Sequence, residues 1–354
     1  MRTGRADLPL HGGRAPAWLF ERMRLLAREI GRAIVEEEGP HGLLRKASDP
    51  FWFQAFGCVL GFDWHSSGLT TTACGALKEG LRPLFGELGV VVAGGKGKTS
   101  RRAPAEIAGG CEGFGIDAAP LVRASRLSAK VDSAAVQDGY DVYHHTFLFS
   151  SDGAWTVVQQ GMNQSNGMAR RYHWHTAPTF VSDPHAGVAG RPEDGVTNLV
   201  ASSGGQNRDV SVALAREEPS KLAAELTRMR TLTMPRHHFV RLADLHPERV
   251  ERVLLKAYEA QPEDYTSLLA VPGVGAKGLR ALAFVAEVTY GAPASVEDPV
   301  SFSFAHGGKD GTPFPVDRKT YDSTIESLKR AVDDAKAGRG DKRAALQRLA
   351  RLRA

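Results

Sequence analysis

The sequence has 354 residues, of which 42% are hydrophobic and 24% are charged. These proportions match globular proteins, so the composition excludes a disordered, fibrous or collagen-like chain, and the length predicts about two domains. The formal net charge is only +5. Cys58, Cys74 and Cys111 lack paired spacing, which argues against a disulfide framework or a zinc ribbon. We identify no signal peptide and no membrane-spanning run, and we expect a cytoplasmic protein with no membrane partner.

Helical and strand patterns are mixed in the first part of the chain and helical patterns dominate the rest. Apolar residues recur at helical spacing over residues 16–38, and Gly39-Pro40 ends this predicted helix. Residues 88–93 are Val-rich and predict a buried strand, and residues 140–162 predict two strands joined at 151–153. We therefore predict an α+β protein, with a mixed α/β candidate catalytic domain over 1–212 and a helical domain over 213–354.

A glycine-rich basic segment, GGKGKTSRR, follows the first predicted strand at residues 94–102. A nucleotide-binding P-loop ending at Lys98 and Thr99 would need glycine where the chain has Val92, so we predict no nucleotide cofactor. The segment is either a contact for DNA phosphates or a solvated basic loop. Its cations are Lys96, Lys98, Arg101 and Arg102.

Acids and histidines are concentrated next to the predicted hairpin, where residues 132–145 contain three aspartates and two histidines. Carboxylates and imidazoles together can bind Mg²⁺ or Mn²⁺ and position a water molecule. We predict that Asp138, Asp141 and His144 hold a divalent metal ion. For any one of these histidines, a purely structural role is the alternative.

Polar residues on the second strand of the hairpin and beyond extend this predicted site. Gln159 and Gln160 lie within cross-strand reach of the histidine pair if 151–153 forms the turn. Neighbours on a strand point to opposite faces, so one residue of each pair must face inward. Further along, Arg170 and Arg171 are suited to clamp a phosphate, and with Gln159 they would steady the scissile group.

The segment LLAVPGVGAKGLRALAFV, at residues 268–285, predicts two helices joined by a tight turn at Pro272, Gly273, Val274 and Gly275. Glycines there permit a sharp turn and leave amide groups uncovered at a helix N-terminus, where the dipole favours a phosphate oxygen. This segment resembles the helix-hairpin-helix motif of DNA-repair proteins, which implies a sequence-neutral grip on the DNA backbone. An ordinary helical corner is the alternative.

The resemblance extends to helix-hairpin-helix DNA glycosylases, in which a lysine follows the hairpin and an aspartate motif follows an apolar segment. Lys277 and Pro315-Val316-Asp317 match these positions, which implies that Lys277 attacks the sugar while Asp317 assists. Their separation of 40 residues is about twice that of the family. Asp317 could instead cap a helix. The last 38 residues carry eleven Lys or Arg against six Asp or Glu, which suits either a DNA-contacting end or a solvated helix.

Over nearly its whole length the chain resembles a bacterial and archaeal family known as domain of unknown function 763. Because no activity is assigned to that family, the resemblance implies relatives but no chemistry. The segments that carry it are LPLHGGRAP, LGFDWHSSG, GGKGKTSR, QDGYDVYHH, VVQQGMN with ARRYHW, and FAHGGKDGTPFPVDR.

Together these patterns predict a DNA-binding, DNA-cleaving enzyme. The main hypothesis is a metal-dependent nuclease acting on the phosphodiester backbone, associated with the nucleoid while bound to DNA. A DNA glycosylase with abasic-site lyase activity is the second hypothesis, and a non-catalytic DNA-binding protein is the third.

Overall fold

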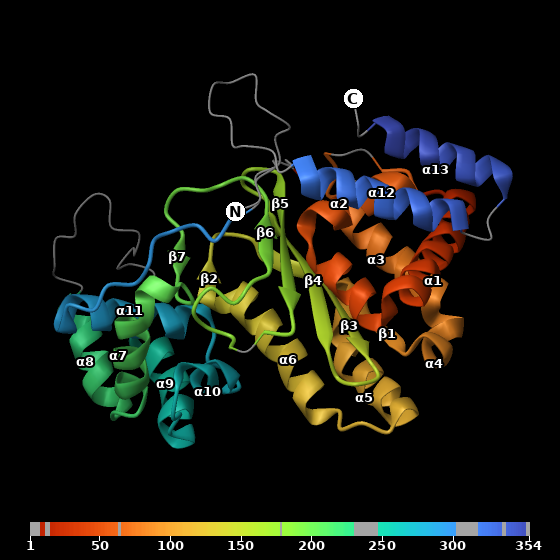
Figure 1. Ribbon diagram of the computed structural model, residues 1–354. Coiled ribbons are helices and arrows are strands. Elements are labelled where there is room, and N and C mark those ends of the chain that lie inside the picture. Colours follow the sequence, from red (N-terminus) through yellow and green to blue (C-terminus); the bar gives the residue numbers. More distant parts are fainter. Residues whose placement is uncertain are drawn as a thin grey trace.

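A computed structural model describes residues 8–10, 15–62, 65–177, 179–229, 247–301, 318–334 and 338–351. These residues form a mixed fold in which helices cover a central antiparallel sheet (Figure 1). The predicted α+β class is confirmed. Within these ranges, no helix combines the length and the apolar composition that crossing a bilayer requires.

The central sheet has five antiparallel strands in the order β1-β3-β4-β5-β6. The predicted hairpin is present, because β3 and β4 are joined by a turn in which the Gly153 amide donates to the Ser150 carbonyl at 2.9 Å. Gly153 has a φ of 87°, which suits glycine. These strands are β1 (Val90–Lys96), β3 (Asp141–Ser150), β4 (Trp155–Asn163), β5 (Met168–His175) and β6 (Gly187–Ala189), and β2 (Val136–Gln137) pairs separately with β7 (Thr197–Asn198).

One face of the sheet is covered by α1 (Ala17–Ser48), α2 (Pro50–Leu60) and α3 (Gly68–Leu81). Val92, Leu148 and Val158 pack into the core formed with these helices. The predicted break at Gly39-Pro40 is a kink inside α1, where Gly39 has a φ of 74°. The helix resumes after the kink because proline is tolerated in the first turn of a helix. The short helices η1 (Arg82–Leu84) and α4 (Phe85–Leu88) lead into β1.

The other face is covered by η2 (Gly97–Arg102), α5 (Ala103–Phe114), α6 (Ala119–Lys130) and η3 (Val131–Ala135), with η4 (Ser202–Gly204) further along the chain. Phe147, Val157 and Trp174 point to this side, one residue out of step with the apolar residues of the first face. The η3 segment is a single π-helical turn. Such turns are rare and are frequent at functional sites.

The helical part of the chain packs on this second side. It comprises α7 (Gly205–Ala215), α8 (Pro219–Met229), α9 (Pro247–Ala260), α10 (Tyr265–Ala270) and α11 (Ala276–Tyr290). The Asn207 side-chain amide ties α7 to α11 by donating to the carbonyls of Ala283 and Ala292 at 2.9 and 2.7 Å. The predicted boundary near residue 212 falls inside α7. The sequence hides the start of this helix because Gly204-Gly205-Gln206-Asn207 is typical of a loop.

The last helices, α12 (Arg318–Asp334) and α13 (Arg339–Arg351), return to the N-terminal helices (Figure 1). Leu328 and Val332 pack into the same core as α1 and α2, and Arg348 Nε donates to the Val59 carbonyl at 2.8 Å. The basic end therefore lies on α1 and α2, whereas the sequence grouped it with the hairpin. The sequence predicted either a DNA-contacting end or a solvated helix here, and it could not show that α12 packs its apolar residues against the N-terminal helices.

Candidate functional site

The predicted hairpin is formed by α10, a turn at residues 271–275, and α11. Asp264 caps α10, since its carboxylate accepts from the Ser267 amide at 2.6 Å. Gly273 has a φ of 91°, so the turn requires glycine there. Val274 is buried, whereas Pro272 and Gly273 are exposed. Val274 therefore anchors the turn in the core, while the tip is exposed to solvent.

The start of α11 has the features that an anion requires. Gly275 is its N-cap, and within the described part of the chain no side chain caps the amides of the first turn. These amides carry the positive end of the helix dipole. A Cβ atom built on Gly275 would meet no atom within 4 Å, so the space in front of the turn is open. Lys277 is exposed in the same turn.

Lys256, from α9, adds a cation at the tip that the sequence did not reveal. Its Nζ lies 3.0 Å from the position that a Cβ atom on Gly273 would take. Gly278 of α11 lets α9 pack closely enough to bring Lys256 here, because a Cβ atom on Gly278 would lie only 2.9 Å from Cγ1 of Val253 on α9. Among the described residues, neither Lys256 nor Lys277 has a carboxylate partner. Only the packing of α9 on α11 brings Lys256 here, so no local pattern could have predicted it.

The hairpin is fixed to the α/β part of the molecule by β2. The Gln137 side chain donates to the Ala276 carbonyl at 2.9 Å and accepts from Arg280 Nε at 2.6 Å. Two consecutive turns of α11 are thus tied to one glutamine. The hairpin is consequently held in a set orientation relative to the sheet.

The basic segment at the end of β1 continues into η2, and Glu106 of α5 anchors β1 at Gly94, just before this segment turns into η2. The Glu106 carboxylate accepts from the Gly94 amide at 2.7 Å and from Lys78 Nζ at 2.6 Å. In the part of the chain that the structure describes, no ion pair involves the cations of this segment, and all of them are exposed. They are Lys96, Lys98, Arg101 and Arg102.

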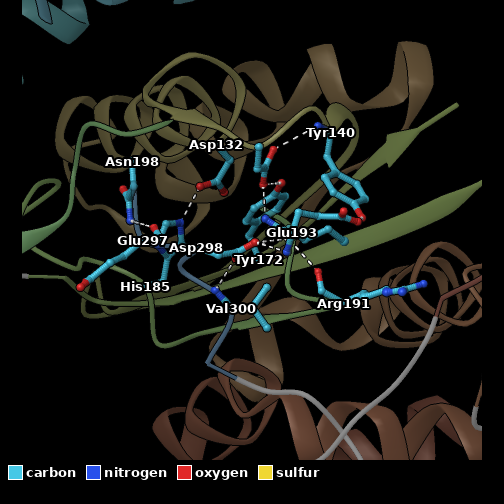
Figure 2. Close-up of polar contacts among 12 residues, drawn as sticks. Asp132, Tyr140, Tyr172, His185, Arg191, Glu193, Asn198, Glu297, Asp298 and Val300 are labelled. Atoms are coloured by element: carbon cyan, nitrogen blue, oxygen red, sulfur yellow. Dashed lines mark hydrogen bonds and ion pairs between the residues drawn. The ribbon is translucent and has the colours of Figure 1, made fainter. Parts of the chain in front are cut away.

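The acid and histidine cluster lies partly in a buried polar network centred on Asp132 of η3 (Figure 2). The Asp132 carboxylate accepts from Gln159 Nε2 at 2.5 Å and from Trp174 Nε1 at 2.9 Å, and it contacts His185 Nε2 at 2.5 Å. Asp132 is fully buried. Its oxygens are therefore engaged by groups that hold η3, β4, β5 and the 179–186 loop together.

Gln159, predicted as a phosphate contact, continues this network to His145. His145 Nδ1 lies 2.9 Å from Gln159 Oε1, and its Nε2 lies 2.8 Å from Ser125 Oγ. Since the Gln159 amide nitrogen donates to Asp132, its oxygen must accept from Nδ1–H of His145. Burial lowers the pKa of His145, which is consistent with the neutral ring. Gln159 is fully buried and joins side chains within the protein.

Asp138 and Arg170 form a second buried network, and Tyr172 and Asp298, which bind to them, lie near Asp132 in Figure 2. The Asp138 carboxylate accepts from Arg170 at 2.8 Å and from the Tyr172 hydroxyl at 2.6 Å. Arg170 also pairs with Asp298, from the segment after α11, at 2.7 Å. Burial opposes the charge, but Asp138 and Asp298 raise the pKa of Arg170. Arg170 is fully buried, and its guanidinium joins β5 to the segment that follows the hairpin.

Arg171 lies on the opposite face of the sheet, as alternation along a strand requires. Its guanidinium donates to His173 Nε2 at 2.7 Å, to Gln54 Oε1 at 2.8 Å and to the Pro50 carbonyl at 3.2 Å. Burial lowers the pKa of Arg171 to about 10. The two arginines predicted to clamp one phosphate therefore point apart, and neither reaches the surface.

The predicted metal ligands are not brought together. Asp138 is engaged by Arg170, Asp141 is exposed at the start of β3, and His144 is buried with Nε2 at 2.9 Å from Thr146 Oγ1. Within the described ranges, no group of three or more His, Cys, Asp or Glu side chains could hold a metal ion. These residues do not fit the predicted site, because Asp138 lies between β2 and β3, while Asp141 and His144 lie on β3 on either side of a bulge.

Two further predicted residues concern the glycosylase resemblance. Lys277 is exposed in the first turn of α11. Asp317 lies outside the described residues, as do Pro315 and Val316. The structure therefore places Lys277 at the hairpin. That Lys277 and Asp317 act together stays a prediction from the sequence.

The geometry defines an α+β protein with an exposed helical hairpin, an exposed basic loop and a charged network inside its sheet domain. The family model described as "Protein of unknown function (DUF763)" matches residues 4–316, and the chain belongs to this family. We found no match among curated proteins and none among solved structures.

Proposed function

We propose that this protein binds DNA through the sugar-phosphate backbone, without reading base sequence, and that the hairpin at residues 271–275 makes the principal contact. The observation that carries the proposal is the exposed tip, where Lys256 Nζ lies beside Gly273 and the uncapped start of α11 follows directly. Helix-terminal amides and ammonium groups both favour a phosphate oxygen.

The conformation of the tip suits a rigid contact. Val274 is buried, and Gln137 binds both Ala276 and Arg280, so the amides of α11 keep their orientation before any ligand arrives. A preorganised site loses less conformational entropy when it binds. The hairpin can therefore hold a phosphate with few contacts.

The exposed cations of η2 provide a second contact for the backbone. Lys98, Arg101 and Arg102 are exposed, and among the described residues no carboxylate neutralises them. Cations that are free of protein partners release counterions from DNA when they bind phosphates. A cytoplasmic protein with this property would associate with the nucleoid.

Substitution of Gly275 tests the proposal without straining the fold. Gly275 has a φ of −113°, and its Cβ position is open, so Gly275→Leu should fold normally while its side chain covers the amides of the tip. We expect duplex affinity to fall at least about tenfold, which corresponds to the loss of one strong hydrogen-bonded contact. Gly113→Leu on α5, where space is also open, is the matched control. Equal affinity of the two variants would refute the hairpin contact.

Cleavage of the bound DNA, by metal-dependent hydrolysis or by lyase chemistry, remains a prediction from the sequence. Labelled duplex, uracil-containing and abasic DNA should be incubated with the protein in Mg²⁺, Mn²⁺ and EDTA. Cleavage that EDTA abolishes and Lys277→Ala retains would support a nuclease. Borohydride trapping that Lys277→Ala abolishes would support a lyase. DNA that is bound but stays intact under all conditions would support a binding protein.

A further inference from the structure

A row of polar side chains crosses the sheet on the face that α1–α3 cover. Lys96 is paired in register with His144, His144 with Gln160, and Gln160 with Arg171, so the row passes through β1, β3, β4 and β5. Its two ends are cations. Among the described residues, neither Lys96 nor Arg171 has a carboxylate partner. The row is thus electropositive, in contrast to the Asp132 and Asp138 networks on the other face.

Two buried atoms in the middle of this row have no hydrogen-bond partner in the described structure. They are His144 Nδ1 and Gln160 Oε1. The orientation of the Gln160 amide is fixed, because its Nε2 donates to the Ser67 carbonyl at 3.0 Å and a carbonyl can only accept. Its Oε1 is therefore an acceptor without a donor. Leaving such atoms buried and unpaired is costly, so the arrangement indicates a bound group that supplies the missing contacts.

A β-bulge shapes the outer end of the row. The register of β3 against β4 shifts between Val142 and His144, and the Tyr143 hydroxyl accepts a hydrogen bond from Gln160 Nε2. Lys96 Nζ lies 5.8 Å from the centre of the Tyr143 ring. Bulges of this kind re-aim side chains and are over-represented beside functional sites. Tyr143, at the bulge, therefore contacts both Gln160 and the exposed Lys96, which is the register partner of His144.

The chemistry of these groups restricts the ligand. Burial lowers the pKa of His144 to about 3, so the ring is neutral and its Nδ1 can exchange a hydrogen bond with a hydroxyl group. Gln160 Oε1 needs a donor, and Lys96 needs an anion. A carboxylate-free row also avoids repulsion of a phosphate.

We infer that the end of the sheet between Lys96 and Gln160 binds a phosphate monoester that carries a hydroxyl group. The phosphate lies at Lys96, and the hydroxyl bridges His144 Nδ1 and Gln160 Oε1. The ligand is either a free mononucleotide or sugar phosphate, or the phosphorylated end of a DNA strand. The site is separate from the hairpin and does not depend on it for its contacts.

Binding should be measured by calorimetry and by the imidazole ¹⁵N resonances of His144, assigned by their loss in His144→Gln. The probes are inorganic phosphate, adenosine monophosphate, and one oligonucleotide with and without a 5′-phosphate. We expect adenosine monophosphate to shift the Nδ1 resonance, and Lys96→Met to weaken its binding about tenfold. Arg82→Met removes another exposed cation of the sheet-containing part of the chain, and this variant should bind the probes as the wild type does. Stronger binding of the phosphorylated oligonucleotide would identify a DNA end as the source.

A His144 resonance that no probe shifts at saturating concentration would overturn the inference, because the row would then be structural only. Equal affinities of Lys96→Met and Arg82→Met would overturn it as well. The same titrations on Gly275→Leu separate this site from the hairpin. Retained phosphate binding with lost DNA binding would support both proposals, whereas wild-type DNA binding by Gly275→Leu would refute only the hairpin contact.

Discussion

The sheet domain and the helical hairpin use their charged residues in different ways. Arg170 is fully buried and pairs with Asp138 and Asp298, so its charge holds segments of the chain together. Lys256 is exposed beside Gly273, and among the described residues no carboxylate neutralises it. The residue type alone did not distinguish these roles. Burial and pairing did, since they engage Arg170 inside the fold and leave Lys256 accessible for the DNA contact that we propose.

The difference has a thermodynamic consequence. A buried charge that loses its partner destabilises the fold, whereas an exposed cation contributes little to stability. Substitutions in the sheet network should therefore change the free energy of unfolding, and substitutions at the hairpin should change affinity.

Arg170→Met should give the largest effect. It leaves the Asp138 carboxylate buried beside Tyr172 without its cation, which costs about 3–5 kcal/mol of unfolding free energy. Urea denaturation measures this. Arg191→Met is the control, since the Arg191 side chain is exposed and only its carbonyl contacts Arg170, so its stability should change by less than about 0.5 kcal/mol. If Arg170→Met were as stable as this control, the network would not be structural.

The pH dependence of stability should follow from the buried histidines of the sheet. Burial lowers the pKa of His144 from 6.5 to about 3, and also lowers that of His173. Below about pH 6.5 the unfolded chain binds protons that the folded chain does not, so stability falls as the pH is lowered. Each such histidine contributes up to about 1.4 kcal/mol per pH unit. Denaturation of His144→Gln between about pH 6.5 and 5 should show a correspondingly shallower decline. An unchanged decline would mean that His144 is protonated in the folded protein.

The basic loop should give a smaller effect, confined to affinity. Arg101→Gln combined with Arg102→Gln removes two exposed cations of η2 and should weaken duplex binding several-fold, with no change in melting temperature. Fluorescence anisotropy against labelled duplex measures this, with Arg82→Gln as the control. Wild-type affinity in the double variant would show that η2 faces away from bound DNA.

The fold could be predicted from the sequence where its signals are local. The turn at residues 151–153, the strand at residues 88–93 and the hairpin at residues 268–285 depend on glycines and alternating apolar residues close together in the chain. The packing of α12 and α13 on α1 and α2 could not be predicted, because an apolar helical face does not specify its partner.

The candidate site was less predictable, because its contacts also join residues that are far apart in the sequence. Arg170 and Arg171 are adjacent in sequence, and strand alternation sends them to opposite faces. Their partners, Asp298 and Gln54, lie more than a hundred residues away. The hairpin residues were predicted because the turn has its glycines close together in the sequence, at Gly273 and Gly275, whereas Lys256 joins them only through the packing of α9.

The salt dependence of duplex binding tests the central claim most directly. In wild-type protein the logarithm of the association constant should fall linearly with the logarithm of salt concentration, because phosphate contacts release counterions. Lys256→Met combined with Lys277→Met should reduce the steepness of this line by about one for each lysine, and Lys221→Met on α8 should leave it unchanged. A double variant with the wild-type slope and affinity would contradict binding of DNA at the hairpin.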